Sequence, residues 1–206
     1  GAFENDGNGT SSGHVRIYSW DGNSWNQLGV DIDGEGEFDL SGNSVSLSSD
    51  GMPVAIGAMG EQDWSNPGAG HVKIYSWNGS NWNQLGADIY GEAFNDNSGW
   101  SVSLSADGMT VAIGAPFNDG NGSNSGHVRI YSWDGNSWNQ LGPDIDGEEA
   151  NDRSGRSVSL SSDGMTVAVG SEGNDGNGLS AGHVRIYSLE SLDLTINNSN
   201  VGVDTQ

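Results

Sequence analysis

Short runs of apolar residues, separated by turns rich in glycine, follow one another along the chain. Two β-branched runs, 101–105 and 110–115, flank Ala-Asp-Gly, a sequence typical of a tight hairpin turn. The next run, 126–133, alternates apolar and polar residues as a strand with one buried face does, and a turn at 134–137 leads into a fourth run, 138–145. No window keeps a helical period, and glycine at this density weakens helices. The pattern predicts units of four antiparallel strands.

These units repeat. The segment Gly-His-Val-Arg/Lys-Ile-Tyr-Ser recurs at spacings of 57, 56 and 56 residues, beginning at Gly13, Gly70, Gly126 and Gly182. Four strands in each unit of this length are typical of a propeller blade. We therefore expect an all-β chain of β-propeller blades, with about three and a half repeats in residues 1–189. We expect residues 190–206 to contain a divergent C-terminal strand, at 192–196, and a tail.

Three segments of one unit resemble the FG-GAP repeat of integrin-α-type β-propellers. They are Ser98-Gly99-Trp100-Ser101-Val102, Ala112-Ile113-Gly114-Ala115-Pro116 and Gly126-His127-Val128-Arg129-Ile130-Tyr131. The resemblance covers roughly residues 1–189. It implies that the first strand of each blade lies nearest the propeller axis, and that the module serves extracellular recognition or adhesion. The chain departs from the family in the loop between the first two strands, where the family's Asp-rich calcium loop is only Ser-Ser-Asp-Gly or Ser-Ala-Asp-Gly.

The strand count predicts an incomplete ring in one chain. Gly1-Ala2-Phe3 matches the end of a second strand, Gly114-Ala115-Pro116, so only three first strands are present. Closed propellers typically have roughly four or more blades. An open array leaves raw sheet edges. We therefore expect either further blades or a homo-oligomer to complete the ring.

Charge and composition exclude several classes of protein. The chain has 28 acidic and 6 basic side chains, a net charge of −22, which repels phosphate backbones and argues against nucleic-acid binding. No apolar run approaches the ~18 residues of a membrane span, so we expect no membrane insertion. Without cysteine the chain has neither disulfides nor thiolate metal sites. The family resemblance points to a secreted or cell-surface location.

Antiparallel strands place the two sets of long, acidic loops on one face of the propeller. These loops are 3–12, 59–69, 116–125 and 172–181 between second and third strands, and 33–42, 90–99 and 146–155 between fourth and first strands. Variable loops on a rigid scaffold often carry function. Four residues break the repeat on this face and are our candidate ligand-binding residues: Trp64, Trp100, Arg153 and Arg156.

The same loops contain candidate calcium ligands. Asn-Asp-Gly-Asn-Gly recurs in the loops between second and third strands, and oxygen ligands around flexible glycines suit a hard cation. The candidate metal residues are Asp6, Asp119 and Asp175 in these loops, and Asp39, Asp96 and Asp152 in the loops between blades. The alternative interpretation is that Asn/Asp-Gly forms ordinary turns without metal.

We expect no enzyme, because no Ser-His-Asp arrangement or phosphate-binding glycine loop stands out. The four histidines occupy the same place in four different strands and do not converge. The leading hypothesis is a non-catalytic extracellular module for adhesion or protein recognition. The alternative is a carbohydrate-binding, lectin-like module that uses exposed tryptophans and calcium. A fragment of an enzyme with active residues elsewhere is the third hypothesis.

Overall fold

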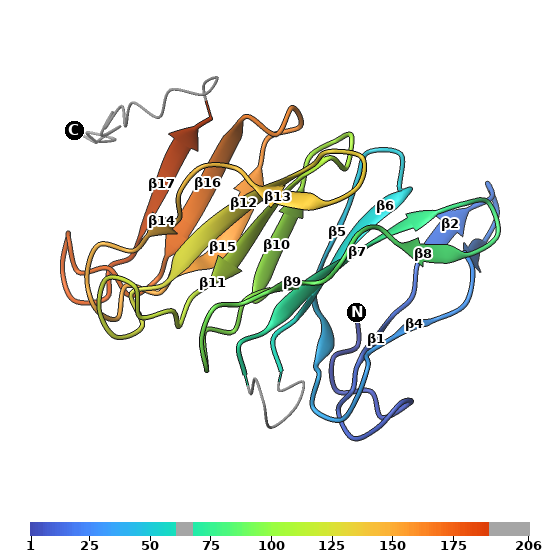
Figure 1. Cartoon of the computed structure of the whole chain (residues 1–206), viewed down its shortest axis with the longest axis horizontal. Helices are drawn as coiled ribbons and strands as arrows, with labels where there is room; N and C mark the ends of the chain where they lie inside the picture. Colours follow the sequence, from blue (N-terminus) through green and yellow to red (C-terminus); the bar gives the residue numbers. More distant parts are fainter. Residues whose placement is uncertain (61–67, 190–206) are drawn as a thin grey trace.

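The computed structural model describes residues 1–60 and 68–189, which form seventeen strands and no helix. The strands make four antiparallel blades that lie side by side, from blade 1 near the N-terminus to blade 4 (Figure 1). Blade 1 contains β1 (His14–Val15), β2 (Tyr18–Trp20), β3 (Trp25–Gln27) and β4 (Ile32–Asp33). Blade 2 contains β5 (Ser41–Leu47), β6 (Pro53–Ala58), β7 (His71–Trp77), β8 (Trp82–Gln84) and β9 (Ile89–Tyr90). Blade 3 contains β10 (Ser101–Leu104), β11 (Thr110–Ala115), β12 (His127–Trp133), β13 (Trp138–Gln140) and β14 (Ile145–Asp146). Blade 4 contains β15 (Ser154–Leu160), β16 (Thr166–Ser171) and β17 (His183–Ser188).

The strand order within a blade follows the chain, which confirms the predicted all-β blades. In blade 3, β10 pairs with β11, β11 with β12, and β12 with both β13 and β14. The fourth strand is thus divided, where the sequence predicted one continuous run from 138 to 145. The division occurs because Leu141 N donates a hydrogen bond to Ile130 O at 2.7 Å and Gly142 follows at a φ of 74°. Such a left-handed residue, favourable for glycine, turns the chain away from the ladder.

The N-terminal residues take the place of a second strand, as the repeat predicts. Ala2 pairs with His14 in the same way that Ala58 pairs with His71 in blade 2. The strand expected at 192–196 lies outside the described residues. None of the sheets within the described residues closes on itself. These residues contain no helix that is long and apolar enough to cross a membrane.

The hydrophobic core lies between neighbouring blades. Between blades 2 and 3, Val72 and Ile74 pack with Val111 and Ile113, all at most 2% exposed. Equivalent clusters fill the spaces between blades 1 and 2 and between blades 3 and 4. Each buried aliphatic side chain contributes about 1.5–3 kcal/mol relative to an exposed one. Contacts between blades therefore stabilise the array.

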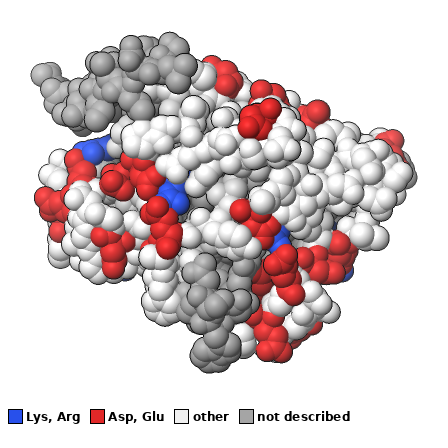
Figure 2. All heavy atoms as spheres, viewed as in Figure 1, with Lys and Arg blue, Asp and Glu red and all other residues white. Residues whose placement is uncertain are grey.

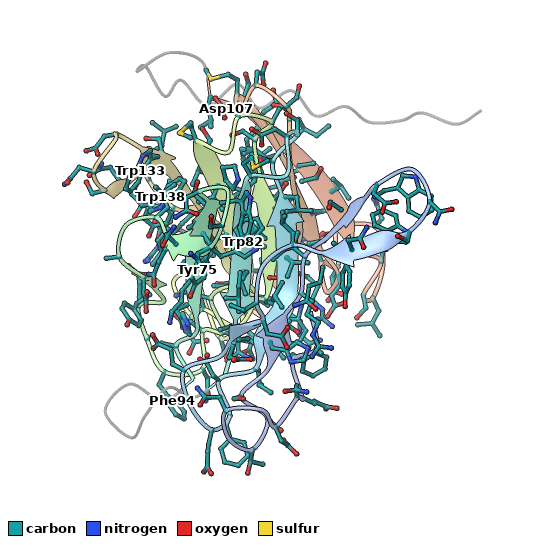
Figure 3. All side chains as sticks on the ribbon, turned by 90° about the vertical axis from the view of Figure 1, so that its right-hand side faces the viewer. Tyr75, Trp82, Phe94, Asp107, Trp133 and Trp138 are labelled. Carbon is teal, nitrogen blue, oxygen red and sulfur yellow. The ribbon has the colours of Figure 1, made fainter. Side chains whose placement is uncertain are left out.

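The tryptophan pairs of the hairpins also join the blades. Trp133 and Trp138 face each other across β12 and β13, with ring centroids 5.4 Å apart (Figure 3). Trp138 Nε1 donates to Leu85 O of blade 2 at 2.8 Å. Trp82 Nε1 donates in the same way to Leu28 O of blade 1. The pairs thus stabilise the hairpin, as expected, and also attach it to the preceding blade.

Candidate functional site

The long loops gather at one end of the blades and the short turns at the other. In Figure 3, Phe94 of a long loop and Asp107 of a short turn lie at opposite ends of the molecule. The bridges Gly70–Ser98 and Gly126–Ser154 bring the ends of the two sets of long loops side by side. The structure therefore places the described parts of the predicted loops on a common face, which we call the long-loop face.

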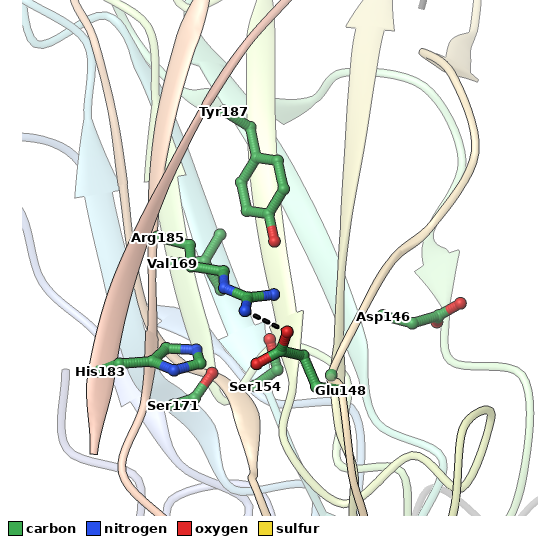
Figure 4. A pocket seen from close by; sticks show the side chains of 9 residues that line it. Asp146, Glu148, Ser154, Val169, Ser171, His183, Arg185 and Tyr187 are labelled. Atoms are coloured by element: carbon green, nitrogen blue, oxygen red, sulfur yellow. Dashed lines mark ion pairs between the residues drawn. The ribbon is translucent and has the colours of Figure 1, made fainter. Parts of the chain in front are cut away.

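Basic side chains on the third strands form a repeated ion pair between blades. Lys73 pairs with Glu35 of the preceding blade, and Arg129 pairs with Glu92 in the next interface. Arg185 and Glu148 form the third such pair, beside β17 (Figure 4). Acidic side chains are spread over the surface in Figure 2, with the few basic ones among them. These pairs neutralise carboxylates where two acidic blades meet.

A second group of charged and aromatic residues lies on the long-loop face between blades 3 and 4. The Arg156 guanidinium carbon lies 4.0 Å from the centre of the Trp100 ring. Trp100 meets Phe117 edge to face at 5.5 Å, and Arg153 lies 5.7 Å from the Phe117 ring centre. Cation–π contacts of this kind contribute about 0.5–2 kcal/mol. We call these residues, together with Glu172, the Trp100–Arg156 cluster.

Glu172 connects the two arginines of the cluster. Its Oε1 lies 3.1 Å from Arg153 Nη1 and 3.2 Å from Arg156 Nε. The hydrogen bond from Arg153, followed by that from Arg156, lowers the pKa of Glu172, so it is ionised at neutral pH. Two guanidinium groups and one carboxylate leave a net positive charge on a negative chain. Arg156 Nη1 is buried and has no hydrogen-bond partner among the described residues.

Three of the four predicted ligand-binding residues therefore come together, namely Trp100, Arg153 and Arg156. Trp64 lies outside the described residues. Sequence reasoning missed Phe117 and Glu172. A signal for Phe117 was present, because blades 2 and 4 carry Gly60 and Gly173 at its position.

The candidate calcium residues of the Asn-Asp-Gly-Asn-Gly loops close their own loops. Asp6 Oδ1 accepts a hydrogen bond from Ser11 N at 2.7 Å, and Asp119 Oδ1 accepts one from Asn124 N at 2.8 Å. Asp175 repeats the arrangement with Ser180 N at 2.6 Å. Calcium binding at these loops stays a prediction.

The candidate acids between blades are buried and connect the loops. Asp96 Oδ2 accepts hydrogen bonds from Asn118 Nδ2 at 2.9 Å and Ala93 N at 3.0 Å. Asp152 accepts equivalent bonds from Asn174 and Glu149. Asp39 accepts a bond from Glu35 N, and its Oδ1 lies 3.7 Å from His71 Nδ1. Asn118 and Asn174 of one loop set thus hold Asp96 and Asp152 of the other.

Two other groups in the described residues bring possible metal ligands within 4.8 Å of one another: His14, Asp31 and Asp33, and Glu92, His127 and Asp144. None of the six predicted aspartates belongs to them. Arg16 Nη2 lies 2.7 Å from Asp31, and Arg129 pairs with both Glu92 and Asp144. Burial lowers the pKa of His127 despite the opposing effect of Asp144, and it lowers the pKa of His71 likewise. Because Arg16 pairs with Asp31 and Arg129 pairs with Glu92 and Asp144, an arginine already neutralises a carboxylate in each group.

Residues 91–131 match the family model of the FG-GAP repeat. This segment is similar to an FG-GAP repeat. It contains β10 and β11, most of β12, and both aromatic residues of the Trp100–Arg156 cluster. The match agrees with the resemblance seen in the sequence. No curated protein matches the chain in sequence at a significant level.

Several solved structures share the fold of this chain at low sequence identity. A Bacteroides uniformis protein provisionally named a 6-phosphogluconolactonase has 10% identity and a TM-score of 0.58, over 86% of this chain and 45% of its own. The periplasmic gluconolactonase PpgL of Pseudomonas aeruginosa has 15% identity and a TM-score of 0.55, over 91% of this chain and 48% of its own. Hydrazine synthase of Kuenenia stuttgartiensis has 11% identity and a TM-score of 0.51, over 84% and 40%. The chain spans less than half the length of these proteins, and the likeness shows the propeller fold alone.

Proposed function

We propose that this β-propeller module is a non-catalytic recognition module of a secreted or cell-surface protein, and that it binds a protein segment through the Trp100–Arg156 cluster. The FG-GAP repeat and the propeller fold support a binding module. The observation that carries the proposal is the stack of Arg156 on Trp100, where one buried guanidinium nitrogen has no described partner. Clustered tryptophan and arginine are typical of binding hot spots.

The cluster fits a segment that presents a carboxylate beside an apolar side chain. The net positive charge of Arg153, Arg156 and Glu172 attracts a carboxylate, and the edges of Trp100 and Phe117 provide apolar contact. The surrounding acidic loops repel ligands that carry many negative charges. The ligand is therefore expected to be a protein segment with a single exposed acid rather than a polyanion.

The test is binding of the labelled chain to an array of peptides that contain one Asp or Glu beside a Leu, Phe or Tyr. Trp100→Ala and Arg156→Lys should abolish binding, because the first removes the ring and the second removes the planar stacked group. Arg16→Ala is the matched control, since Arg16 pairs with Asp31 in blade 1, away from the cluster. Equal binding by all four proteins would contradict the proposal.

The alternative function is carbohydrate binding, with calcium as a candidate cofactor. Trp20 and Trp25 favour it, since their rings lie 5.5 Å apart and Trp25 is 67% exposed, as a sugar-stacking surface requires. Binding to a glycan array that is lost in Trp25→Ala and kept in Trp100→Ala would establish this function instead. Turnover of a lactone or another substrate by the chain would identify an enzyme and overturn both proposals.

A further inference from the structure

We propose that Asn78 is a modification site, at which the folded chain converts its own asparagine side chain to a carboxylate by deamidation. The residue lies in the exposed turn between β7 and β8 of blade 2 and is followed by Gly79. Deamidation joins the nitrogen of the following residue to the asparagine side chain, and a glycine, which has no side chain, leaves that nitrogen most accessible. The proposal concerns a different part of the molecule from the Trp100–Arg156 cluster and does not rest on the proposed ligand.

The side-chain carbonyl of Asn78 has the hydrogen bonds that the reaction needs. Ser80 N donates to Asn78 Oδ1 at 2.9 Å, and Asn81 N donates to the same oxygen at 2.8 Å. When a nitrogen attacks the side-chain carbon, negative charge develops on this oxygen. Backbone donors that are aimed at such an oxygen beforehand stabilise the transition state, as in an oxyanion hole. The turn therefore promotes attack on Asn78 Cγ.

The nitrogen that attacks is accessible as well. Among the described residues, the Gly79 N–H has no hydrogen-bond partner. The space beside Gly79 is open, since a Cβ built on it would meet nothing within 4 Å. The Gly79 nitrogen can therefore lose its proton to hydroxide and approach Asn78 Cγ without breaking a hydrogen bond.

The other Asn-Gly pairs of the chain lack this combination. They are Asn8-Gly9, Asn121-Gly122 and Asn177-Gly178, and in each the glycine N–H donates to a backbone carbonyl of its own loop. Gly122 N, for example, donates to Asp119 O at 3.2 Å. The Asn121 side-chain nitrogen donates to Gly147 O at 2.8 Å and to Glu148 O at 2.9 Å. Hydrogen bonds thus hold both reacting groups at Asn121 and must break before it can react.

The reaction consumes one water and releases one ammonia. The deprotonated Gly79 nitrogen forms a bond to Asn78 Cγ, which closes a succinimide ring. The bond from Cγ to the side-chain nitrogen breaks, and that nitrogen leaves as ammonia after taking a proton from water, which regenerates the hydroxide. Water then opens the ring: cleavage of the new bond between Cγ and Gly79 N gives aspartate, and cleavage of the backbone bond gives isoaspartate. Water and hydroxide are the co-reactants.

An aspartate product fits this turn, because blades 1 and 3 carry aspartate at the same position. Asp21 Oδ1 accepts hydrogen bonds from Asn23 N and Ser24 N, both at 2.8 Å. Asp21 Oδ2 accepts a further bond from Asn26 Nδ2 at 2.7 Å. These bonds, led by the one from Ser24 N, lower the pKa of Asp21 to about 2. Asp134 makes the equivalent bonds in blade 3, so the turn favours a carboxylate.

In blade 2 the asparagine places a donor where the other two turns have an acceptor. Because Asn78 Oδ1 faces the backbone donors, Asn78 Nδ2 takes the place of Asp21 Oδ2. Asn83 corresponds to Asn26, and among the described residues its Nδ2 donates only to Asn81 O, at 3.4 Å. Deamidation replaces the Asn78 nitrogen by an oxygen and supplies an acceptor for Asn83. The modified turn thus gains a hydrogen bond that blades 1 and 3 have from the start.

The test follows deamidation of the folded chain during storage at neutral pH in heavy-oxygen water. Peptide mass spectrometry locates each converted asparagine, because the reaction replaces an NH group by one oxygen that comes from the solvent. Asn78 should convert at least about tenfold faster than Asn121, which must first break hydrogen bonds at both reacting groups. In concentrated urea the two residues should convert at similar rates, because a glycine follows each and neither keeps its folded contacts.

Matched variants test whether the turn itself promotes the reaction. Asp21→Asn creates an Asn-Gly pair on the two equivalent backbone donors of blade 1, and it should deamidate at a rate comparable to that of Asn78. Asp134→Asn serves in the same way in blade 3, and circular dichroism checks that both variants fold. The proposal is overturned if Asn121 converts as fast as Asn78 in the folded chain. It is also overturned if neither variant asparagine converts faster than Asn121.

Discussion

The contact between Gly114 of blade 3 and Gly155 of blade 4 gives a sharp test of how the blades are held together. Gly114→Ala adds one carbon that overlaps the Gly155 carbonyl, whose carbon would be 2.9 Å away. The Gly155 carbonyl belongs to the backbone and cannot rotate away as a side chain can. Blade 4 must therefore move away from blade 3 by on the order of 1 Å. The retreat also weakens the hydrogen bond from Ser101 Oγ to Gly155 O.

Overpacking of this kind lowers the free energy of unfolding by about 1–3 kcal/mol. We expect the upper end of this range because the added Cβ meets backbone atoms, which cannot change rotamer. For a chain of this size about 3 kcal/mol lowers the melting temperature by about 6–12 °C. Gly170→Ala is the matched control, since its Cβ meets only the side chain of Ser157, which can rotate. Its cost is expected to stay below about 1 kcal/mol, offset by the lower entropy of the unfolded chain.

The assay is thermal and urea unfolding of the chain and both variants, followed by circular dichroism and tryptophan fluorescence. Gly114→Ala should lower the midpoint far more than Gly170→Ala, with little change in the folded spectrum. Equal midpoints for the two variants would refute the reasoning, because the two glycines differ in the described structure mainly in whether a neighbouring blade approaches.

Three further predictions concern stability. Trp138→Phe removes the Nε1 donor to Leu85 O and should cost about 1 kcal/mol, whereas Trp25→Phe, at an exposed ring, should cost less than about 0.5 kcal/mol by urea unfolding. Burial lowers the pKa of His71 and His127 below the unfolded value of 6.5. Their contribution to stability is therefore complete above about pH 6.5 and is lost as the pH falls through their folded pKa values. Unfolding measured at about pH 7.5 and about pH 5.5 should show this loss, and equal stability at the two pH values would count against it. Millimolar calcium should raise the melting temperature above that in chelator at matched ionic strength, and an equal rise with sodium chloride would mean plain screening of the charge of −22.

Much of the fold follows from local sequence signals. The Ala-Asp-Gly turn joins β10 and β11 in the expected register, and the alternating run after it forms β12. The division of the fourth strand at Leu141 and Gly142 was missed, because the bend depends on a hydrogen bond to Ile130 across the blade. Strand periodicity describes which face a residue takes and carries no information about such a cross-strand bond.

The site was harder to predict than the fold, because its contacts cross between blades. Trp100 and Arg156 were chosen since they break the repeat, and the structure brings them together. Glu172 looked like one more acid in an acidic loop, and only the approach of Arg153 from the adjoining loop distinguishes it. Repeat comparison thus finds unusual residues, whereas pairing them requires knowledge of how one blade sits on the next.

The ordered contacts from Asn43 to Trp100 and from Trp100 to Arg156 bear on how the chain folds correctly. Blades 2, 3 and 4 have nearly the same core residues, so during folding a first strand can pack against the wrong neighbour at almost no energetic cost. Repeat proteins are prone to such misassembly. Asn43 donates to a backbone carbonyl, which every repeat offers at this position, so that hydrogen bond does not distinguish one blade from another. The cation–π stack does, because only Trp100 followed by Arg156 forms it, and a wrongly ordered pair of blades loses it. This one contact thereby favours the native order of two otherwise similar blades.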